Sequence, residues 1–149
     1  MGIIKTLLRI AIMNQINLAL PQASCFLVLI TFYLNSCNDK DIYKRDLLSN
    51  DIDKIDEACF KLGEAKDTSA VKLLLINILD PRMSTNLRYK GMTVNYCRLG
   101  ALRKIAGTDF GRKIDQFKVD TIATNIYLDW AVRKGYIRNT GEVDIYYKR

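Results

Sequence analysis

Hydrophobic residues recur three and four positions apart in several segments after residue 50. Between Asp51 and Gly63 they form one stripe, at Ile52, Ile55, Cys59 and Leu62. This spacing places them on one side of a helix. Asp51 and Asp53 favour its start, because carboxylates are stabilised at the positive end of a helix, and Gly63 is expected to end it.

Similar spacing predicts more helices along the rest of the chain. They cover residues 68–79, residues 93–106, a segment from 114 or 117 to 134, and a shorter one at 42–48. Asp80-Pro81, Gly107 and Gly135 are expected to end the three longer ones. The tail from Glu142 alternates weakly and is either a short extended piece or a frayed end. The predicted fold class is all-α.

The first 38 residues are apolar and carry only basic charges. Lys5 and Arg9 are the charged side chains before Asp39, so this segment contributes +2 to a net charge of +7. A run of about ten apolar residues, 25–34, is short for a membrane-spanning helix and typical of a secretory signal. The N-terminal segment is therefore expected to direct export.

The residues Leu34-Asn35-Ser36-Cys37 resemble the lipobox of bacterial lipoproteins, although Asn35 stands where alanine or glycine is more usual. The resemblance implies a signal peptide over residues 1–36, cleavage before Cys37, and acylation of that cysteine. The mature protein would then be attached to a bacterial membrane on the periplasmic or cell-surface side. Two alternatives stay open: an uncleaved membrane anchor, and a helix that belongs to a soluble fold.

Two segments resemble the first helices of HEAT-type repeats. They are residues 57–63 and 100–107, in which Ala58 matches Ala101 and Leu62 matches Ile105, each 43 positions later. A period near 40–47 with two helices is that of such repeats. The resemblance covers residues 51–135 and implies stacked helical hairpins, with an irregular helical bundle as the alternative. Residues 37–50 would be a tether with a capping helix, and 136–149 a C-terminal tail.

Catalytic and metal chemistry find little support. The chain has no histidine, which excludes Ser-His-Asp and Cys-His catalysis and zinc sites that contain histidine. Its four cysteines form no close pair, and its eight glycines form no phosphate-binding loop. Cys59 and Cys97 stand at apolar helical positions and are expected as buried thiols, or as a disulfide after export. We therefore expect no enzyme, no cofactor and no metal.

Basic residues outnumber acidic ones, 23 to 16. They gather around the third predicted helix and the following turn, at Arg98, Arg103, Lys104, Arg112, Lys113 and Lys118. Export argues against a nucleic-acid partner. An anionic membrane surface or an acidic protein fits such a cluster better, and a solubilising face is the simplest interpretation.

The segment from Arg82 to Met92 is the candidate contact surface, with Arg82, Arg88, Tyr89 and Lys90 as its binding residues. Long loops in compact domains are often functional, and Arg, Tyr and Met are enriched in interfaces. The leading hypothesis is a lipid-anchored helical-repeat protein that binds another protein in the bacterial envelope. The alternatives are a membrane accessory with a retained N-terminal helix, and an immunity- or inhibitor-type protein that binds a toxin or an enzyme.

Overall fold

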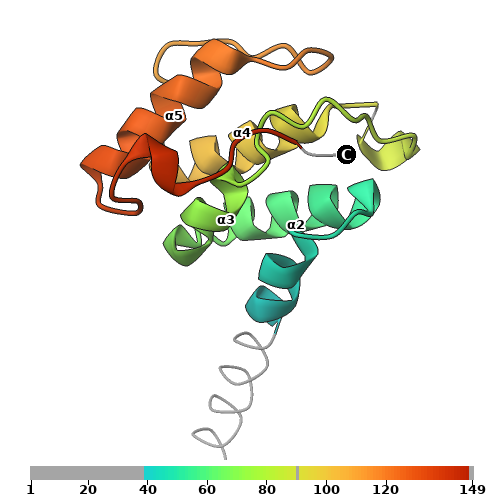
Figure 1. Ribbon diagram of the computed structural model, residues 1–149. Coiled ribbons are helices and arrows are strands. Elements are labelled where there is room, and N and C mark those ends of the chain that lie inside the picture. The colour runs from blue at the N-terminus through green and yellow to red at the C-terminus, as the bar shows by residue number, and fades with distance from the viewer. Residues whose placement is uncertain (1–38, 90, 148–149) are drawn as a thin grey trace, which may run out of the picture. The chain divides into compact units, whose positions relative to one another are not determined.

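The computed structural model describes residues 39–89 and 91–147. All of these except Asp39 belong to one compact unit, Lys40–Arg149. Its helices are α2 (Ile52–Glu64), α3 (Val71–Leu75), α4 (Val94–Ala106) and α5 (Thr121–Arg133), with residues 39–46 also helical (Figure 1). Among the described residues the only extended pairing that is assigned is an isolated bridge between Met83 and Thr93. The all-α prediction is confirmed, whereas the predicted signal peptide and Cys37 lie outside the described residues.

Helices α2 and α4 lie side by side and run in the same direction (Figure 1). Asp56 and Cys97, early in each helix, line one cavity, while Glu64 and Lys104, late in each, form an ion pair. The approach is closest at Gly63, where an added Cβ would lie 3.0 Å from the Cα of Ala101. The prediction that Gly63 ends α2 is wrong: this glycine lies inside the helix and provides room for α4.

The starts of α2 and α4 and the end of α4 are set by residues next to them in the sequence. Asp51 caps α2, because its carboxylate accepts hydrogen bonds from the backbone N–H groups of Asp53 and Lys54. Thr93 caps α4 in the same way through Tyr96 N–H, and Gly107 ends it with a φ of 70°. These boundaries agree with the prediction to within one or two residues.

The second predicted helix is shorter than expected. After the turn Thr68–Ala70, α3 ends at Leu75, and Asn77 has a φ of 54°. The N–H groups of Asn77 and Leu79 instead donate to the carbonyls of Asp144 and Ile145, at 2.8 and 3.0 Å. The tail is therefore held against residues 77–79 by backbone hydrogen bonds, without an assigned strand.

The last helix begins later than predicted. Asp120 caps α5 by accepting from Ala123 N–H at 2.8 Å, and its carboxylate also pairs with Arg112 at 2.9 Å. Residues 107–120 form a loop in which Phe110 and Gly111 both have positive φ values. The apolar side chains at 114 and 117 thus belong to a loop, and the exposed one, Phe117, is among those that mislead a periodicity argument.

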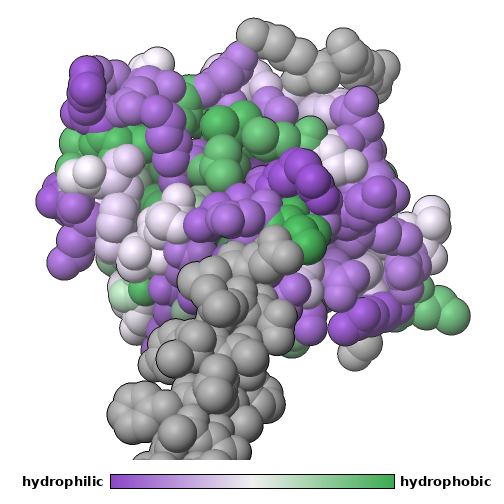
Figure 2. Space-filling model, turned by 90° about the horizontal axis from the view of Figure 1, so that it is seen from below, coloured by the Kyte–Doolittle hydropathy of each residue, from purple (hydrophilic) through white to green (hydrophobic). Residues whose placement is uncertain are grey.

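The core is formed where these helices meet the tail. Its fully buried side chains include Leu47, Ile55, Leu62, Leu74, Leu75, Ile78, Leu99 and Leu102, and Ile137 and Val143 join them from the C-terminal region. Leu47 comes from the predicted tether and capping helix, and Ile137 and Val143 come from the predicted C-terminal tail. On the face shown in Figure 2, hydrophilic side chains predominate and hydrophobic ones gather in separate patches.

Candidate functional site

A cavity of about 120 Å³ lies between α2 and α4, under the segment that leads into α4. It is lined by Asp56, Cys59, Phe60, Tyr89, Met92, Tyr96, Cys97, Gly100, Ala101 and Lys104. Because Gly100 has no side chain, it contributes no side-chain atoms to this space. The lining is chiefly apolar and aromatic, with a few polar groups, which is the usual composition of a small-molecule site.

Asp56 is the polar group that distinguishes this cavity. Its side chain comes from the buried face of α2 and is 1% exposed, yet neither carboxylate oxygen has an N–H or O–H donor among the described residues. Burial raises the pKa of Asp56 to about 6, while the Cys97 thiol and the Arg98 charge act in the opposite direction. A buried carboxylate without N–H or O–H donors is unusual, because desolvation of a charge is costly unless hydrogen bonds or a counter-charge offset it.

Two thiols stand beside this carboxyl group. Cys59 and Cys97 are both free, and burial raises the pKa of Cys59 to about 12 and also raises the pKa of Cys97. Asp56 contributes to both shifts, since a neighbouring negative charge disfavours a thiolate. Both cysteines are therefore thiols at neutral pH, and they lack the thiolate character that a reactive cysteine needs.

The side of the cavity nearest solvent is formed by Phe60 and Lys104. Phe60 is 49% exposed, and the Lys104 ammonium lies 4.6 Å from the centre of its ring. The same ammonium forms an ion pair with Glu64. Lys104 therefore already has an acidic partner on the surface and leaves the Asp56 carboxylate unpaired.

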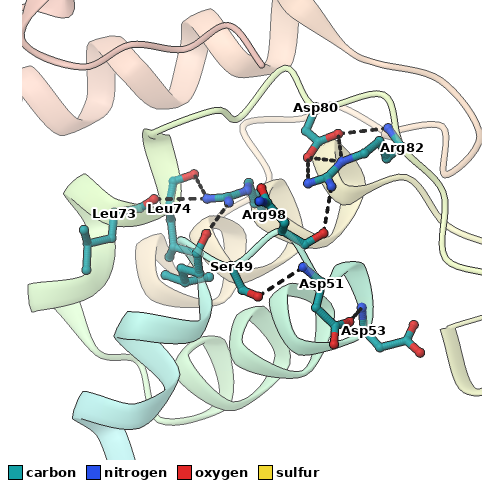
Figure 3. Close-up of polar contacts among 10 residues, drawn as sticks. Ser49, Asp51, Asp53, Leu73, Leu74, Asp80, Arg82 and Arg98 are labelled. Atoms are coloured by element: carbon teal, nitrogen blue, oxygen red, sulfur yellow. Dashed lines mark hydrogen bonds and ion pairs between the residues drawn. The ribbon is translucent and has the colours of Figure 1, made fainter. Parts of the chain in front are cut away.

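Arg98 lies on the buried side of α4, deeper than the cavity. Its guanidinium donates to the carbonyl oxygens of Leu47 at 2.7 Å, Leu73 at 3.0 Å and Leu74 at 3.4 Å (Figure 3). These carbonyls lie where the helix at residues 39–46 and helix α3 come to an end, so one side chain caps both. Burial lowers the pKa of Arg98, which is 1% exposed. Its predicted place in a surface basic cluster is wrong.

Arg82, a predicted binding residue, is held in a second, partly buried network. Its guanidinium pairs with the buried Asp80 at 2.7 Å (Figure 3) and donates to the carbonyl of Asn50 at 2.9 Å. It also stacks on Tyr147, 4.3 Å from the centre of the ring. These contacts join the loop after α3 to the segment before α2 and to the tail. Arg82 thus has intramolecular partners for its charge.

The loop between Arg82 and α4 is attached to α2. The Ser84 hydroxyl donates to one carboxylate oxygen of Asp53 at 2.7 Å, and the Asn86 amide donates to the other at 3.3 Å. The Asn86 side chain in turn accepts from Arg88 N–H at 3.0 Å, at the start of the turn Leu87–Tyr89. This leaves Leu87 at the tip, 93% exposed.

The structure brings together only part of the predicted contact set. Arg88 and Tyr89 are neighbours on the loop; the first is exposed and lies 4.0 Å from Glu57, and the second is buried against the cavity. Arg82 lies apart in its own network, and Lys90 falls outside the described residues. The role of these residues in binding stays a prediction.

Sequence reasoning missed Asp56 and Leu87 as site residues. In the sequence, Asp56 stands among the acidic residues near the start of α2, with Asp51, Asp53 and Glu57, which is typical of a solvated helix start. Its spacing held the signal: position 56 is four after Ile52 and three before Cys59, and so lies on the apolar face of α2. Leu87 carried no such signal, because nothing in its neighbours indicates how far a loop residue extends into solvent.

No family model, curated protein or solved structure matches this chain. Among the residues that the structure describes, no cluster of three or more Cys, Asp or Glu side chains could hold a metal ion. Within the same residues, no helix has the length and apolar character needed to cross a membrane.

Proposed function

We propose that this chain is a protein-binding module whose contact surface is the tip of the loop at residues 83–89. The observation that carries the proposal is Leu87, a leucine that is 93% exposed on a loop attached to a helix by side-chain hydrogen bonds. A scattered exposed apolar residue is ordinary, but Leu87 shares its loop with the half-exposed Met83 and the exposed Arg88, and Met and Arg are enriched at interfaces.

The attachment of the loop supports a binding role energetically. Ser84 and Asn86 both bond to Asp53, and Tyr89 is buried beneath the turn. A surface that is already ordered loses less conformational entropy when a partner binds, so more of the contact free energy appears as affinity. Leu87 and Arg88 are thus presented on a pre-organised turn.

A non-catalytic role agrees with the chemistry of the interior. The two thiols that line the cavity have raised pKa values, and Asp56 is the one acidic side chain lining it among the described residues. Nucleophilic catalysis needs a nucleophile activated by a base or by a lowered pKa. The parallel packing of α2 on α4 supports an arrangement of HEAT-like hairpins, whose exposed surfaces bind partners without inherent chemistry.

The proposed location is the bacterial envelope, with the domain held at the membrane by lipid on Cys37. What supports it is the apolar, acid-free N-terminal segment that ends in a lipobox-like Leu34-Asn35-Ser36-Cys37. Intact-mass spectrometry of the protein from host membranes is expected to show a chain that begins at Cys37 and carries acyl groups. A mass equal to the unmodified full chain would instead indicate a retained N-terminal anchor.

Replacing Leu87 and Arg88 with alanine is expected to weaken partner binding at least about tenfold and to leave the fold unchanged. Truncating a central apolar anchor and its adjacent arginine typically costs 1 kcal/mol or more of binding free energy, about 1.4 kcal/mol for each factor of ten. The measurement is crosslinked capture from host membranes followed by affinity measurement with the captured partner.

The matched control replaces Phe117 and Ile122, which are similarly exposed apolar residues near the start of α5. This variant is expected to bind the partner as the native protein does. Equal affinity of the native protein and the Leu87/Arg88 variant would remove the loop from the interface, provided that both unfold at the same urea concentration.

A further inference from the structure

We propose that the cavity between α2 and α4 binds a small organic cation, whose ammonium, amidinium or guanidinium group lies against the Asp56 carboxylate. The apolar part of the ligand would lie against Phe60, Tyr96 and Met92. This inference does not rest on the proposed role of the Leu87 loop, since it concerns the cavity and not the exposed tip of the loop, although Tyr89 of that loop lines the cavity.

The unpartnered carboxylate is the first argument. A carboxylate can accept about four hydrogen bonds, and buried carboxylates in folded proteins normally receive donors. Asp56 lines the cavity and is 1% exposed, and neither of its oxygens has an N–H or O–H donor among the described residues; the Cys97 thiol, a weak donor, is the side chain that acts on it. A ligand with several N–H groups would provide the donors that the protein does not.

The size and lining of the cavity define the rest of the ligand. Its volume is about 120 Å³, slightly below the roughly 150 Å³ of an apolar cavity that accommodates benzene. A ligand of that size has room for one charged group and a short apolar portion. Phe60, Tyr89 and Tyr96 place aromatic rings around this space, and aromatic faces attract cations.

The charges around Asp56 favour a cation over a neutral donor. The groups that act on its carboxyl are Asp53 and Asp80, which are acidic, and Arg98, which is basic. Asp80 is paired with Arg82, Lys104 with Glu64, and Arg88 lies near Glu57. The charges without an ion-pair partner are then the carboxylates of Asp53 and Asp56 and the guanidinium of Arg98. Their sum is one negative charge beside the cavity. The thiols of Cys59 and Cys97 add none, because burial raises their pKa values.

The test is a titration of the full chain in detergent with n-butylammonium and, separately, methylguanidinium, followed by ¹H–¹⁵N NMR. Saturable shifts are expected at amides around Asp56 and Cys97, with n-butanol, the neutral analogue of the first probe, binding at least tenfold more weakly. Asp56→Asn should weaken cation binding at least tenfold. Asp129→Asn, the same change on the exposed face of α5, should leave it unchanged.

Two further measurements distinguish the site from general attraction to acidic groups. Affinity for the cations should rise about tenfold between pH 5 and pH 7.5, because Asp56, with its pKa of about 6, ionises over that range. Gly100→Leu should abolish binding by filling the cavity, since a Cβ at Gly100 meets no other group within 4 Å.

Three outcomes would overturn the proposal. They are n-butanol binding as tightly as the cations, cation binding that survives Asp56→Asn or Gly100→Leu, and no saturable shift of the native protein with either cation. None of these outcomes bears on the Leu87/Arg88 capture experiment, so the two proposals fail separately.

Discussion

Replacing Arg98 with methionine is expected to lower the free energy of unfolding by about 3–5 kcal/mol, the largest effect of any single substitution considered for this chain. Methionine matches the length of the buried stem but cannot donate hydrogen bonds. The carbonyls of Leu47, Leu73 and Leu74 would then be left in the interior without this donor. Each orphaned buried acceptor costs about 1–3 kcal/mol. Urea unfolding followed by far-ultraviolet circular dichroism measures the change.

The matched control is Arg103→Met on the exposed side of the same helix, which should change stability by less than about 0.5 kcal/mol. Arg98→Lys keeps the charge but presents a single ammonium to three carbonyls, so it should fall between the native protein and Arg98→Met. If Arg98→Met lowered the free energy of unfolding by less than about 1 kcal/mol, the guanidinium would not be the group that joins the end of the helix at residues 39–46 to the end of α3.

Replacing Asp56 with asparagine is expected to stabilise the protein at neutral pH and to have much less effect at pH 4. Burial raises the pKa of this carboxyl from 3.8 to about 6. Between those values the folded protein binds more protons than the unfolded chain, so the native stability falls as pH rises through this window and stays low above it. Asparagine does not titrate and avoids this loss.

The difference between the two pH values is the quantity to measure. The free energy of unfolding of Asp56→Asn minus that of the native protein should be larger at pH 7.5 than at pH 4, by on the order of 2 kcal/mol. Urea unfolding at each pH measures this difference. Asp129→Asn on the exposed face of α5 is the control and should show no such gain. An effect of Asp56→Asn that is equal at both pH values would mean that the carboxyl is not held in a desolvated site.

These two predictions describe opposite solutions to the same problem, the burial of a charge. The Arg98 guanidinium is buried with three carbonyl acceptors for its terminal nitrogens, and Asp56 is buried without an N–H or O–H donor among the described residues. A buried group that lowers stability at neutral pH while lining a cavity is typical of a functional site, where binding takes precedence over stability. This contrast is the reason that the ligand inference rests on Asp56.

The helix starts and the all-α class followed from residues that act on their own neighbours. Asp51 and Thr93 accept hydrogen bonds from backbone N–H groups at the starts of α2 and α4, and Gly107 ends α4. These partners lie within four positions, so the effect does not depend on the rest of the fold. Gly63 carried the same local signal as Gly107 and was wrongly predicted to end a helix. A glycine is needed at position 63 because α4 packs closely against it. The contact is with Ala101, which lies 38 positions later in the chain.

The candidate site was predicted only in part, for the same reason. Arg88 and Tyr89 could be singled out because they are adjacent in a loop of interface-like composition. The burial of Arg98 could not, because its acceptors lie 24 to 51 positions away, and charge clustering along the chain suggested a surface instead. Similarly, Arg82 looked available until the structure placed Asp80 and Tyr147 against it.

The sequence by itself determined where helices begin, which faces are apolar, and that histidine chemistry is absent. Only the tertiary structure decided that α3 ends early against the tail and that a cavity remains between α2 and α4. It also decided that Asp56 lacks an N–H or O–H donor among the described residues, whereas Arg98 donates to three carbonyls. Local hydrogen bonding and side-chain periodicity act over about four residues, and can be recognised in a sequence. Desolvation, pairing of charges and packing volume depend on segments that meet only after the chain has folded.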